Sequence, residues 1–165
     1  MKILVFSDSH SGLSFMLSCV DAVEPDAMIH LGDYYEDSEV LAEEYPDIPL
    51  YRVPGNCDRF RCPPGTAEIC IERIGGVNFY LTHGHRHNVK LTTGLLIRDA
   101  RDCCVDAVLY GHTHIAACDR ETDGLWVFNP GSCGYYGGSA GIIDIVDGKI
   151  INMRIIRQDD LEAMG

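Results

Sequence analysis

The chain has 165 residues, of which 46% are hydrophobic and 23% charged, as expected for one globular domain. Its formal net charge of −12 argues against a surface that grips a nucleic-acid backbone, and no run approaches the roughly 20 apolar residues of a membrane span or the apolar core of a signal peptide. We therefore expect a single domain over residues 1–165, located in the cytoplasm, that binds neither nucleic acid nor a membrane.

Strands and helices alternate through the first half of the chain. The predicted strands span 2–6, 27–31 and 50–53, and the predicted helices span 13–23 and 37–45. Ser11 is expected to cap the first helix, and the acidic stretch 36–44 is interpreted as the solvated face of the second. This alternation indicates parallel strands joined by right-handed crossovers.

The second half combines one more crossover with three hairpins. A strand over 107–110 follows a helix over 92–102, which opens at Thr92 or Thr93. The hairpins pair 69–74 with 77–81, 118–121 with 126–128, and 142–146 with 150–156, each across a turn that contains glycine. Parallel units and hairpins together indicate two mixed sheets packed face to face with helices outside. We expect residues 158–165 to form a frayed tail.

Cysteines do not indicate a disulfide framework. In a chain without a secretion signal, reduced thiols are expected, and no pair has the C-x-x-C spacing of a zinc ribbon. Most stand in apolar surroundings, so we expect most to be small buried hydrophobic side chains. The eight are Cys19, Cys57, Cys62, Cys70, Cys103, Cys104, Cys118 and Cys133.

Metal-binding residue types follow five of the predicted strands. In chain order they are Asp8, His10, Asp33, Asn56, His83, His112 and His114. Since the strands of an α/β sheet end along one edge, these side chains are expected to meet there. A carboxylate can bridge two cations, and amide oxygens and imidazole nitrogens complete such a site. The pattern predicts one binuclear metal centre, for which phosphoester hydrolysis is the most economical function.

The motifs around these residues resemble those of the calcineurin-like metallophosphoesterases, specifically the small prokaryotic YfcE-type phosphodiesterases. The matching blocks are Asp8-Ser9-His10, Gly32-Asp33, Gly55-Asn56, His83-Gly84-His85 and Gly111-His112-Thr113-His114. The resemblance covers positions 3 to 157. It implies a four-layer α/β/β/α sandwich of two mixed β-sheets flanked by helices, and a metal-dependent phosphodiesterase that acts on a small phosphoester.

The resemblance also implies which residues bind which ion. Asp8, His10 and His114 would bind the first metal, Asn56, His83 and His112 the second, and Asp33 would bridge the two. Two divalent cations are expected, with Mn²⁺ favoured by the resemblance and Fe²⁺, Ni²⁺ or Zn²⁺ compatible with the same ligands. Such a pair lowers the pKa of a bridging water, so that a hydroxide can attack the phosphorus.

The catalytic residues expected from the resemblance are Asp33, Asn56, Cys57 and His85. Many relatives carry histidine directly after the motif asparagine, where it protonates the leaving group. This chain has Cys57, as is common in the YfcE-type branch, and a thiol is a poorer replacement. His85 is the nearest alternative donor in the sequence. Pro54 also replaces a residue that is often basic in relatives.

Several other polar residues receive structural interpretations. His30, inside an apolar strand, is expected to be a hydrogen-bonded core residue. Asp58 is interpreted as a helix cap, with support of the metal ligands as the alternative. Arg59 and Arg61 are interpreted as surface charges, with phosphate contact as the alternative. His87 is interpreted as a loop residue. Tyrosines are expected to pack at the rim; they are Tyr34, Tyr35, Tyr135 and Tyr136.

Two alternatives to the phosphodiesterase remain open. One is a metal-bound interaction scaffold, like the eukaryotic retromer subunit of this fold, although no ligand of the motif set is missing here. The other is a phosphomonoesterase or a nuclease, which would use the same metal core. By analogy, a homodimer is also expected.

Overall fold

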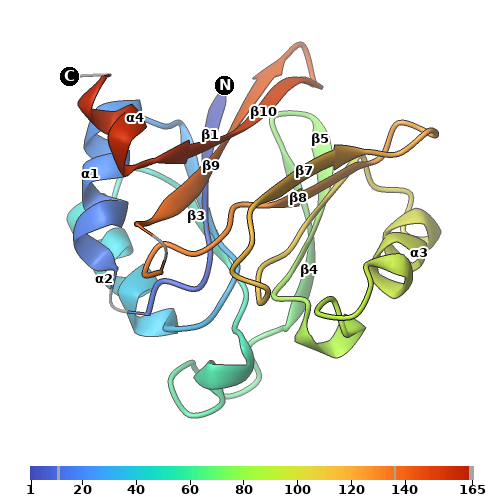
Figure 1. Cartoon of the computed structure of the whole chain (residues 1–165), viewed down its shortest axis with the longest axis horizontal. Coiled ribbons are helices and arrows are strands. Elements are labelled where there is room, and N and C mark those ends of the chain that lie inside the picture. Colours follow the sequence, from blue (N-terminus) through green and yellow to red (C-terminus); the bar gives the residue numbers. More distant parts are fainter. Residues whose placement is uncertain (11, 136, 164–165) are drawn as a thin grey trace.

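In a computed structural model, which describes residues 1–10, 12–135 and 137–163, two five-stranded β-sheets pack face to face. Helices α1, α2 and α4 lie outside one sheet and α3 lies outside the other (Figure 1). The predicted four-layer α/β/β/α sandwich of mixed sheets is therefore confirmed.

The first sheet contains the N-terminal crossovers and has the strand order β10-β9-β1-β2-β3. Strands β1, β2 and β3 are parallel, whereas β9 is antiparallel to β1 and to β10. Its elements are β1 (Lys2–Phe6), α1 (Leu13–Val23), β2 (Ala27–His30), α2 (Tyr35–Glu44), β3 (Leu50–Arg52), β9 (Ser139–Val146), β10 (Lys149–Arg157) and α4 (Gln158–Glu162).

The second sheet has the order β4-β5-β6-β8-β7. Strands β5, β6 and β8 are parallel, and β4 and β7 are antiparallel edge strands. Its elements are β4 (Ile69–Ile74), β5 (Val77–Thr82), α3 (Gly94–Asp102), β6 (Ala107–Leu109), β7 (Ala117–Arg120) and β8 (Trp126–Asn129), and two short 3₁₀ turns, η1 (Asn56–Asp58) and η2 (His85–His87), follow β3 and β5.

Alternation along β1 explains how the layers are held together. Ile3 and Val5 point into the core between the sheets, whereas Leu4 and Phe6 point outward beneath the helices. All four side chains are fully buried. Strand β1 is therefore fixed on both faces, and the chain that follows it leaves the sheet at a defined point.

The predicted helices have small boundary errors. Helix α1 has its predicted span, and Ser11 lies outside the described residues. Helix α2 begins at Tyr35 rather than 37, and α3 begins at Gly94, whose N–H donates to Oγ1 of Thr92. The solvated-face interpretation of 36–44 is wrong at Asp37, which is buried and accepts a hydrogen bond of 2.7 Å from Ser9 Oγ.

Two further expectations are wrong. The tail is not frayed through its described part, because α4 forms there and buries Leu161 in the cluster that contains Met16 and Val20 of α1. Of the cysteines, which are all free, only Cys19 and Cys133 are buried, because most of the others stand on edge strands or in turns. No helix in the described part of the chain is long and apolar enough to cross a membrane.

Candidate metal centre

The metal-binding residue types predicted from the sequence gather from both sheets at one edge of the sandwich. Asp8 and His10 follow β1, Asp33 follows β2, and Asn56 begins η1 after β3. From the second sheet, His83 follows β5, and His112 and His114 follow β6. We call these seven residues the candidate metal centre.

Asp8 belongs to both of the close groups of possible metal ligands in the centre. Two groups have ligand atoms that all lie within 4.8 Å of one another: Asp8 with His10 and His114, and Asp8 with Asp33 and His83. In the first group, His114 Nε2 lies 3.1 Å from Asp8 Oδ1 and 3.3 Å from His10 Nε2. In the second, His83 Nε2 lies 3.5 Å from Asp33 Oδ2 and 3.8 Å from Asp8 Oδ1. Each group can hold one cation.

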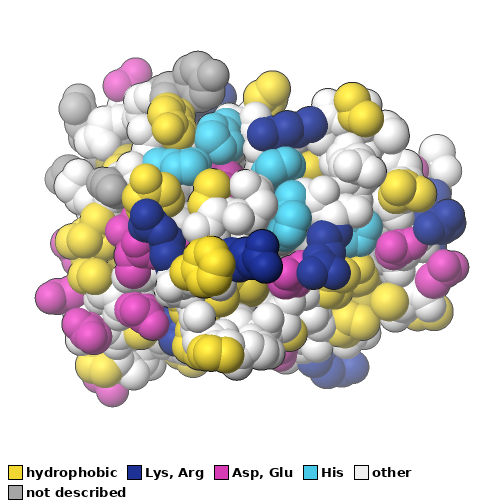
Figure 2. Space-filling view, turned by 90° about the horizontal axis from the view of Figure 1, so that it is seen from below, with side chains coloured by type: hydrophobic (Ala, Val, Ile, Leu, Met, Phe, Trp, Pro, Cys, Tyr) yellow, Lys and Arg dark blue, Asp and Glu magenta, His cyan; other side chains and the backbone are white. Residues whose placement is uncertain are grey.

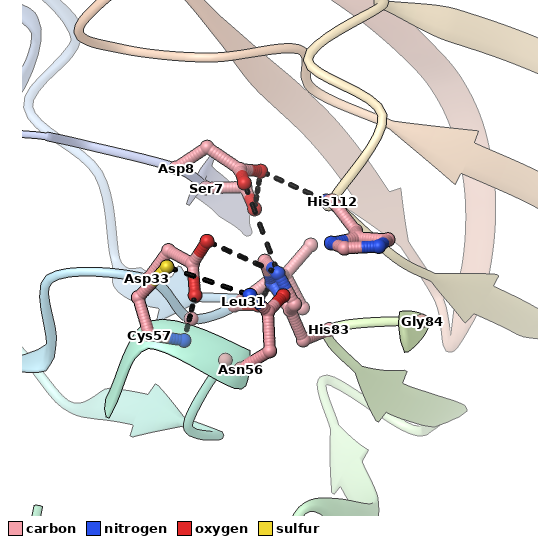
Figure 3. Close-up of polar contacts among 12 residues, drawn as sticks. Ser7, Asp8, Leu31, Asp33, Asn56, Cys57, His83, Gly84 and His112 are labelled. Atoms are coloured by element: carbon pink, nitrogen blue, oxygen red, sulfur yellow. Dashed lines mark hydrogen bonds and ion pairs between the residues drawn. The ribbon is translucent and has the colours of Figure 1, made fainter. Parts of the chain in front are cut away.

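The buried atoms of this cluster fit a cation. Oδ1 of Asp8 and Nε2 of His83 are buried and have no partner in hydrogen-bonding geometry among the described residues. Nδ1 of His83 lies 2.8 Å from the Leu31 carbonyl, to which it donates, so that Nε2 faces the carboxylates (Figure 3). Burying such atoms unpaired is costly, and a divalent cation would pair both.

The residues predicted for the second ion are brought together less closely. The ring of His112 lies 5.0 Å from that of His83 between centroids, but His112 belongs to neither close group. Asn56, at the start of η1, is exposed, and its Nδ2 donates to Cys57 Sγ at 3.4 Å (Figure 3). The division of ligands between two ions, with Asp33 as the bridge, stays a prediction.

The other oxygen of Asp8 is held by the protein. Oδ2 accepts hydrogen bonds from Ser7 Oγ at 2.6 Å and from the backbone N–H of His112 at 3.0 Å. A Cβ on Gly111 would overlap Ser7 Oγ and lie 2.7 Å from Asp8 Oδ2, so only glycine lets the chain after β6 approach this carboxylate. These contacts orient Oδ1 toward the histidines.

The backbone of the candidate metal centre is strained. Left-handed φ angles occur at Asp8 (51°), His10 (41°), Asp33 (60°), His112 (68°) and His114 (60°). Residues other than glycine rarely adopt this conformation, and when they do, they cluster at functional sites. The sequence carried no signal for this strain.

Asp58 braces the loop that carries Asp33. Its carboxylate is fully buried and accepts backbone hydrogen bonds from Asp33 (2.8 Å), Gly55 (2.7 Å) and Tyr35 (3.0 Å). A capping role explains only the hydrogen bond from Gly55, so the interpretation of Asp58 as a helix cap is wrong as its main role. The alternative, that Asp58 supports the metal ligands, accounts for the hydrogen bond from Asp33.

Charges within the centre shift the pKa values of its members. Burial opposes ionisation of Asp8 and Asp33, but the contacts and charges of His114 and His83 outweigh it, and both pKa values lie below the ordinary range. Burial lowers the pKa of His83, yet its contact with Asp33 and the charge of Asp8 raise it overall. Burial and the charge of His83 lower the pKa of His112 to about 4. Both carboxylates are thus ionised and available to a cation.

The two predicted proton donors differ in their surroundings. Burial and the charge of Asp33 raise the pKa of Cys57 to about 11, and the backbone N–H of Cys57 donates to Asp33 Oδ1 at 2.9 Å. The Nε2 atom of His85 lies 3.8 Å from Oε2 of Glu68, a residue that the sequence analysis did not single out. His85 Nδ1 is buried without a hydrogen-bond partner in the described chain.

Histidines outside the centre have structural partners. His30 is fully buried between the Gly32 N–H (3.3 Å) and Ser9 Oγ (3.4 Å), as predicted, and burial lowers its pKa to about 4. His87 is not merely a loop residue, because it is buried with its ring against the Tyr80 hydroxyl at 3.2 Å.

Aromatic and basic side chains border the centre. The rings of Tyr34 and Tyr135 contact His10, and Tyr135 stacks on His114 at 5.1 Å. Tyr35 is instead buried, and Tyr136 lies outside the described residues. Arg61 pairs with Glu36 and lies over Tyr34, and Arg59 lies over the ring of Phe60. Both arginines are exposed, as expected of surface charges, and the alternative role in phosphate contact stays a prediction.

Comparison with known proteins identifies relatives along most of the chain. The family model of the calcineurin-like phosphoesterase superfamily domain matches residues 1–148. The probable metallophosphoesterase YsnB of Bacillus subtilis is 34% identical over 136 residues, which cover 80% of this chain and 75% of that protein. The phosphodiesterase MJ0936 of Methanocaldococcus jannaschii is 29% identical over 164 residues, covering 87% and 93% of the two chains.

Solved structures share the fold. A "predicted phosphoesterase" of Streptococcus pneumoniae superposes with a TM-score of 0.74 at 25% identity, over 96% of this chain and 90% of that one. The phosphoesterase YfcE of E. coli gives 0.64 at 22% identity, over 93% and 98%. Vps29 of Entamoeba histolytica in complex with zinc gives 0.69 at 20% identity, over 95% and 99%. The last two likenesses concern the fold alone.

Proposed function

This chain is a metallophosphoesterase of the calcineurin-like phosphoesterase superfamily, and we propose that it is a metal-dependent phosphodiesterase that hydrolyses a small phosphoester at a binuclear centre. The proposal rests on one observation above all. Buried, ionised carboxylates and imidazole nitrogens converge at one edge, and the buried atoms left without a hydrogen-bond partner there include Oδ1 of Asp8 and Nε2 of His83, which a cation would bind.

Each part of the centre has a proposed task. When bound, divalent cations would neutralise charge on the phosphoryl oxygens and lower the pKa of a nearby water. Asp8 and Asp33 would fix the cations, and the Leu31 carbonyl would keep His83 in the tautomer whose Nε2 faces them. Asn56, exposed at the start of η1, would contact a phosphate oxygen through its side-chain amide.

The leaving group would be protonated by Cys57 or His85. The Cys57 thiol keeps its proton at neutral pH, because its pKa is raised to about 11, so it is a weak acid. Substrates with poor leaving groups should therefore react more slowly than activated aryl esters unless His85 assists. Comparing Cys57→Ala and His85→Ala across esters of increasing leaving-group pKa would identify the donor.

Hydrolysis of bis(4-nitrophenyl) phosphate tests the proposal. The manganese-loaded protein should release 4-nitrophenolate, and chelation or Asp33→Ala should abolish release. Asp47→Ala, at an exposed residue in the connection between α2 and β3 that belongs to neither the centre nor its partners, is the matched control and should retain activity. Turnover that survives both chelation and the Asp33 change would refute the proposal. A panel with a monoester, cyclic nucleotides and single-stranded DNA separates the phosphodiesterase from a phosphomonoesterase or nuclease.

An interaction scaffold is the second candidate, favoured by the likeness of the fold to Vps29, which binds zinc in a solved structure. Metal binding alone therefore does not discriminate between the two functions. Absence of turnover of every phosphoester by fully loaded protein, together with a stable protein partner in pull-downs, would support the scaffold.

A further inference from the structure

A side pocket with a volume of about 770 Å³ opens next to the candidate metal centre. We define it by Asn56, Phe60, Pro63, Pro64, His85 and Arg86, which line it. Asn56 belongs to the centre, and His85 has its ring 5.6 Å from that of His83 between centroids. The side pocket is therefore continuous with the place where phosphate would bind, and its volume suits an organic group of nucleoside size rather than phosphate alone.

The most exposed aromatic side chain of the described chain lies in this pocket. Phe60 is 91% exposed, so nearly the whole apolar surface of its ring is in contact with water. The turn that carries it is ordered, because the N–H groups of Arg61 and Cys62 donate to the Asp58 carbonyl at 2.8 and 3.2 Å. Since Asp58 also accepts a hydrogen bond from the Asp33 N–H, the backbone of the turn that carries Phe60 is tied to the loop that carries Asp33.

The charge around the pocket favours a phosphodiester anion. Arg86 pairs with Glu68, so these two charges offset each other. Arg59 has no carboxylate within 4.0 Å in the described chain and lies 5.5 Å from the Phe60 ring centroid. Although the chain carries a net charge of −12, Figure 2 shows Lys and Arg side chains around the histidines on this face. Of the arginines near the pocket, Arg59 is thus the one whose charge no described carboxylate offsets within 4.0 Å, and it is available to an anionic ester.

From these observations we propose that the side pocket receives an aromatic ester group of the substrate, stacked on Phe60, so that the natural substrates are aryl or nucleoside phosphodiesters. The inference rests on the proposed function, because the phosphate must lie at the candidate metal centre. Stacking explains both the exposed ring and the rigid proline wall of Pro63 and Pro64, and Arg59 would hold the Phe60 ring in place through its own stacking contact.

Equilibrium binding to the manganese-loaded protein, measured by titration calorimetry, tests the stacking step. The probes are methylphosphonate, phenylphosphonate and thymidine 5′-monophosphate. We expect the wild type to bind phenylphosphonate about two- to ten-fold more tightly than methylphosphonate, the range of one aromatic pair. Phe60→Ala should remove this preference, and Phe60→Tyr should keep it. Ile151→Ala, which truncates an exposed apolar side chain on β10, should change nothing.

The probes also distinguish the two sources of the ring. Tighter binding of thymidine 5′-monophosphate than of phenylphosphonate, lost in Phe60→Ala, indicates nucleoside esters, and the reverse order indicates simple aryl esters. Equal binding of methyl- and phenylphosphonate, or a preference that survives Phe60→Ala, overturns the inference. Its failure is separable from that of the proposed function. Hydrolysis of bis(4-nitrophenyl) phosphate with an unchanged binding ratio refutes only the pocket, and a Phe60-dependent ratio without hydrolysis refutes only the enzyme.

Discussion

Left-handed backbone occurs at both ends of the strands, but residues other than glycine adopt it mainly at one end. In the hairpin turns that join β4 to β5 and β9 to β10, it falls on Gly75, Gly76 and Gly148, and on Asp147. At the opposite edge it falls on glycines, among them Gly32 and Gly84, but also on five residues of the candidate metal centre: Asp8, His10, Asp33, His112 and His114. Three of these four hairpin positions are glycine, which adopts this conformation at little cost. The centre uses residues that do so under strain, which indicates that their chemistry was retained at a cost in stability.

The largest expected difference between the two edges is in activity. Asp8→Ala should lower kcat/KM for bis(4-nitrophenyl) phosphate by on the order of 10³-fold or more, because a lost cation removes several kcal/mol of charge stabilisation. Asp147→Ala, at a similar φ of 49°, should leave kcat/KM within about two-fold. Steady-state kinetics with saturating Mn²⁺ measures both, and equal effects would break the comparison.

The second difference is in the dependence of stability on pH. His30 is buried near the centre, where its pKa is lowered to about 4 from a model-peptide value of 6.5. As the pH falls from 6.5 to 4, His30 therefore becomes protonated in the unfolded chain but stays neutral in the folded chain. The unfolding free energy of the metal-free protein should fall in this window by up to roughly 3 kcal/mol from this residue.

Denaturant unfolding of His30→Gln isolates that contribution. The variant should show a flatter pH dependence between pH 6.5 and 4 than the wild type. An unchanged slope would mean that His30 becomes protonated in the folded protein.

Glycine at the two edges should also respond differently to a methyl group. In Gly111→Ala the added Cβ would overlap Ser7 Oγ and press on Oδ2 of Asp8. We expect manganese affinity to fall about 10- to 100-fold, as it does when a hydrogen bond that orients a metal ligand is lost. Gly148→Ala meets no atom closer than 3.8 Å and should only strain the turn. Calorimetric titration with Mn²⁺ compares the two, and a normal affinity in Gly111→Ala would contradict the close approach.

Thiol reactivity provides the smallest contrast. Cys57 at the centre and Cys104 after α3 are both exposed, but the pKa of Cys57 is raised to about 11 by burial and the charge of Asp33. Iodoacetamide at pH 8 should modify Cys57 about ten-fold more slowly than Cys104, since a smaller thiolate fraction is partly offset by greater nucleophilicity. Peptide mass spectrometry measures both rates, and faster modification of Cys57 than of Cys104 would contradict the raised pKa of Cys57.

The fold could be predicted, and the seven residues of the candidate metal centre could be singled out, because their signals are local. Each strand end carries its motif directly after an apolar run, and each hairpin has glycine at its turn. The family and the enzyme class followed from the same motifs and are confirmed by the comparisons.

What could not be predicted depends on contacts between distant segments. Asp58 fits a local cap, and only the fold brings the Asp33 loop against its carboxylate. The burial of Asp37 depends on Ser9 from another strand end. The single apolar Leu161 gives no periodicity, so helix α4 has no sequence signal until α1 offers a surface for it.

Anomalous diffraction from crystals grown with excess Mn²⁺ tests the central claim most directly. The account predicts two manganese peaks per chain, one within coordination distance of Asp8, His10 and His114, and one at His83, with Asp33 in contact with both. A single peak, no peak at this edge, or peaks beyond coordination distance of Asp8 and Asp33 would contradict a binuclear centre.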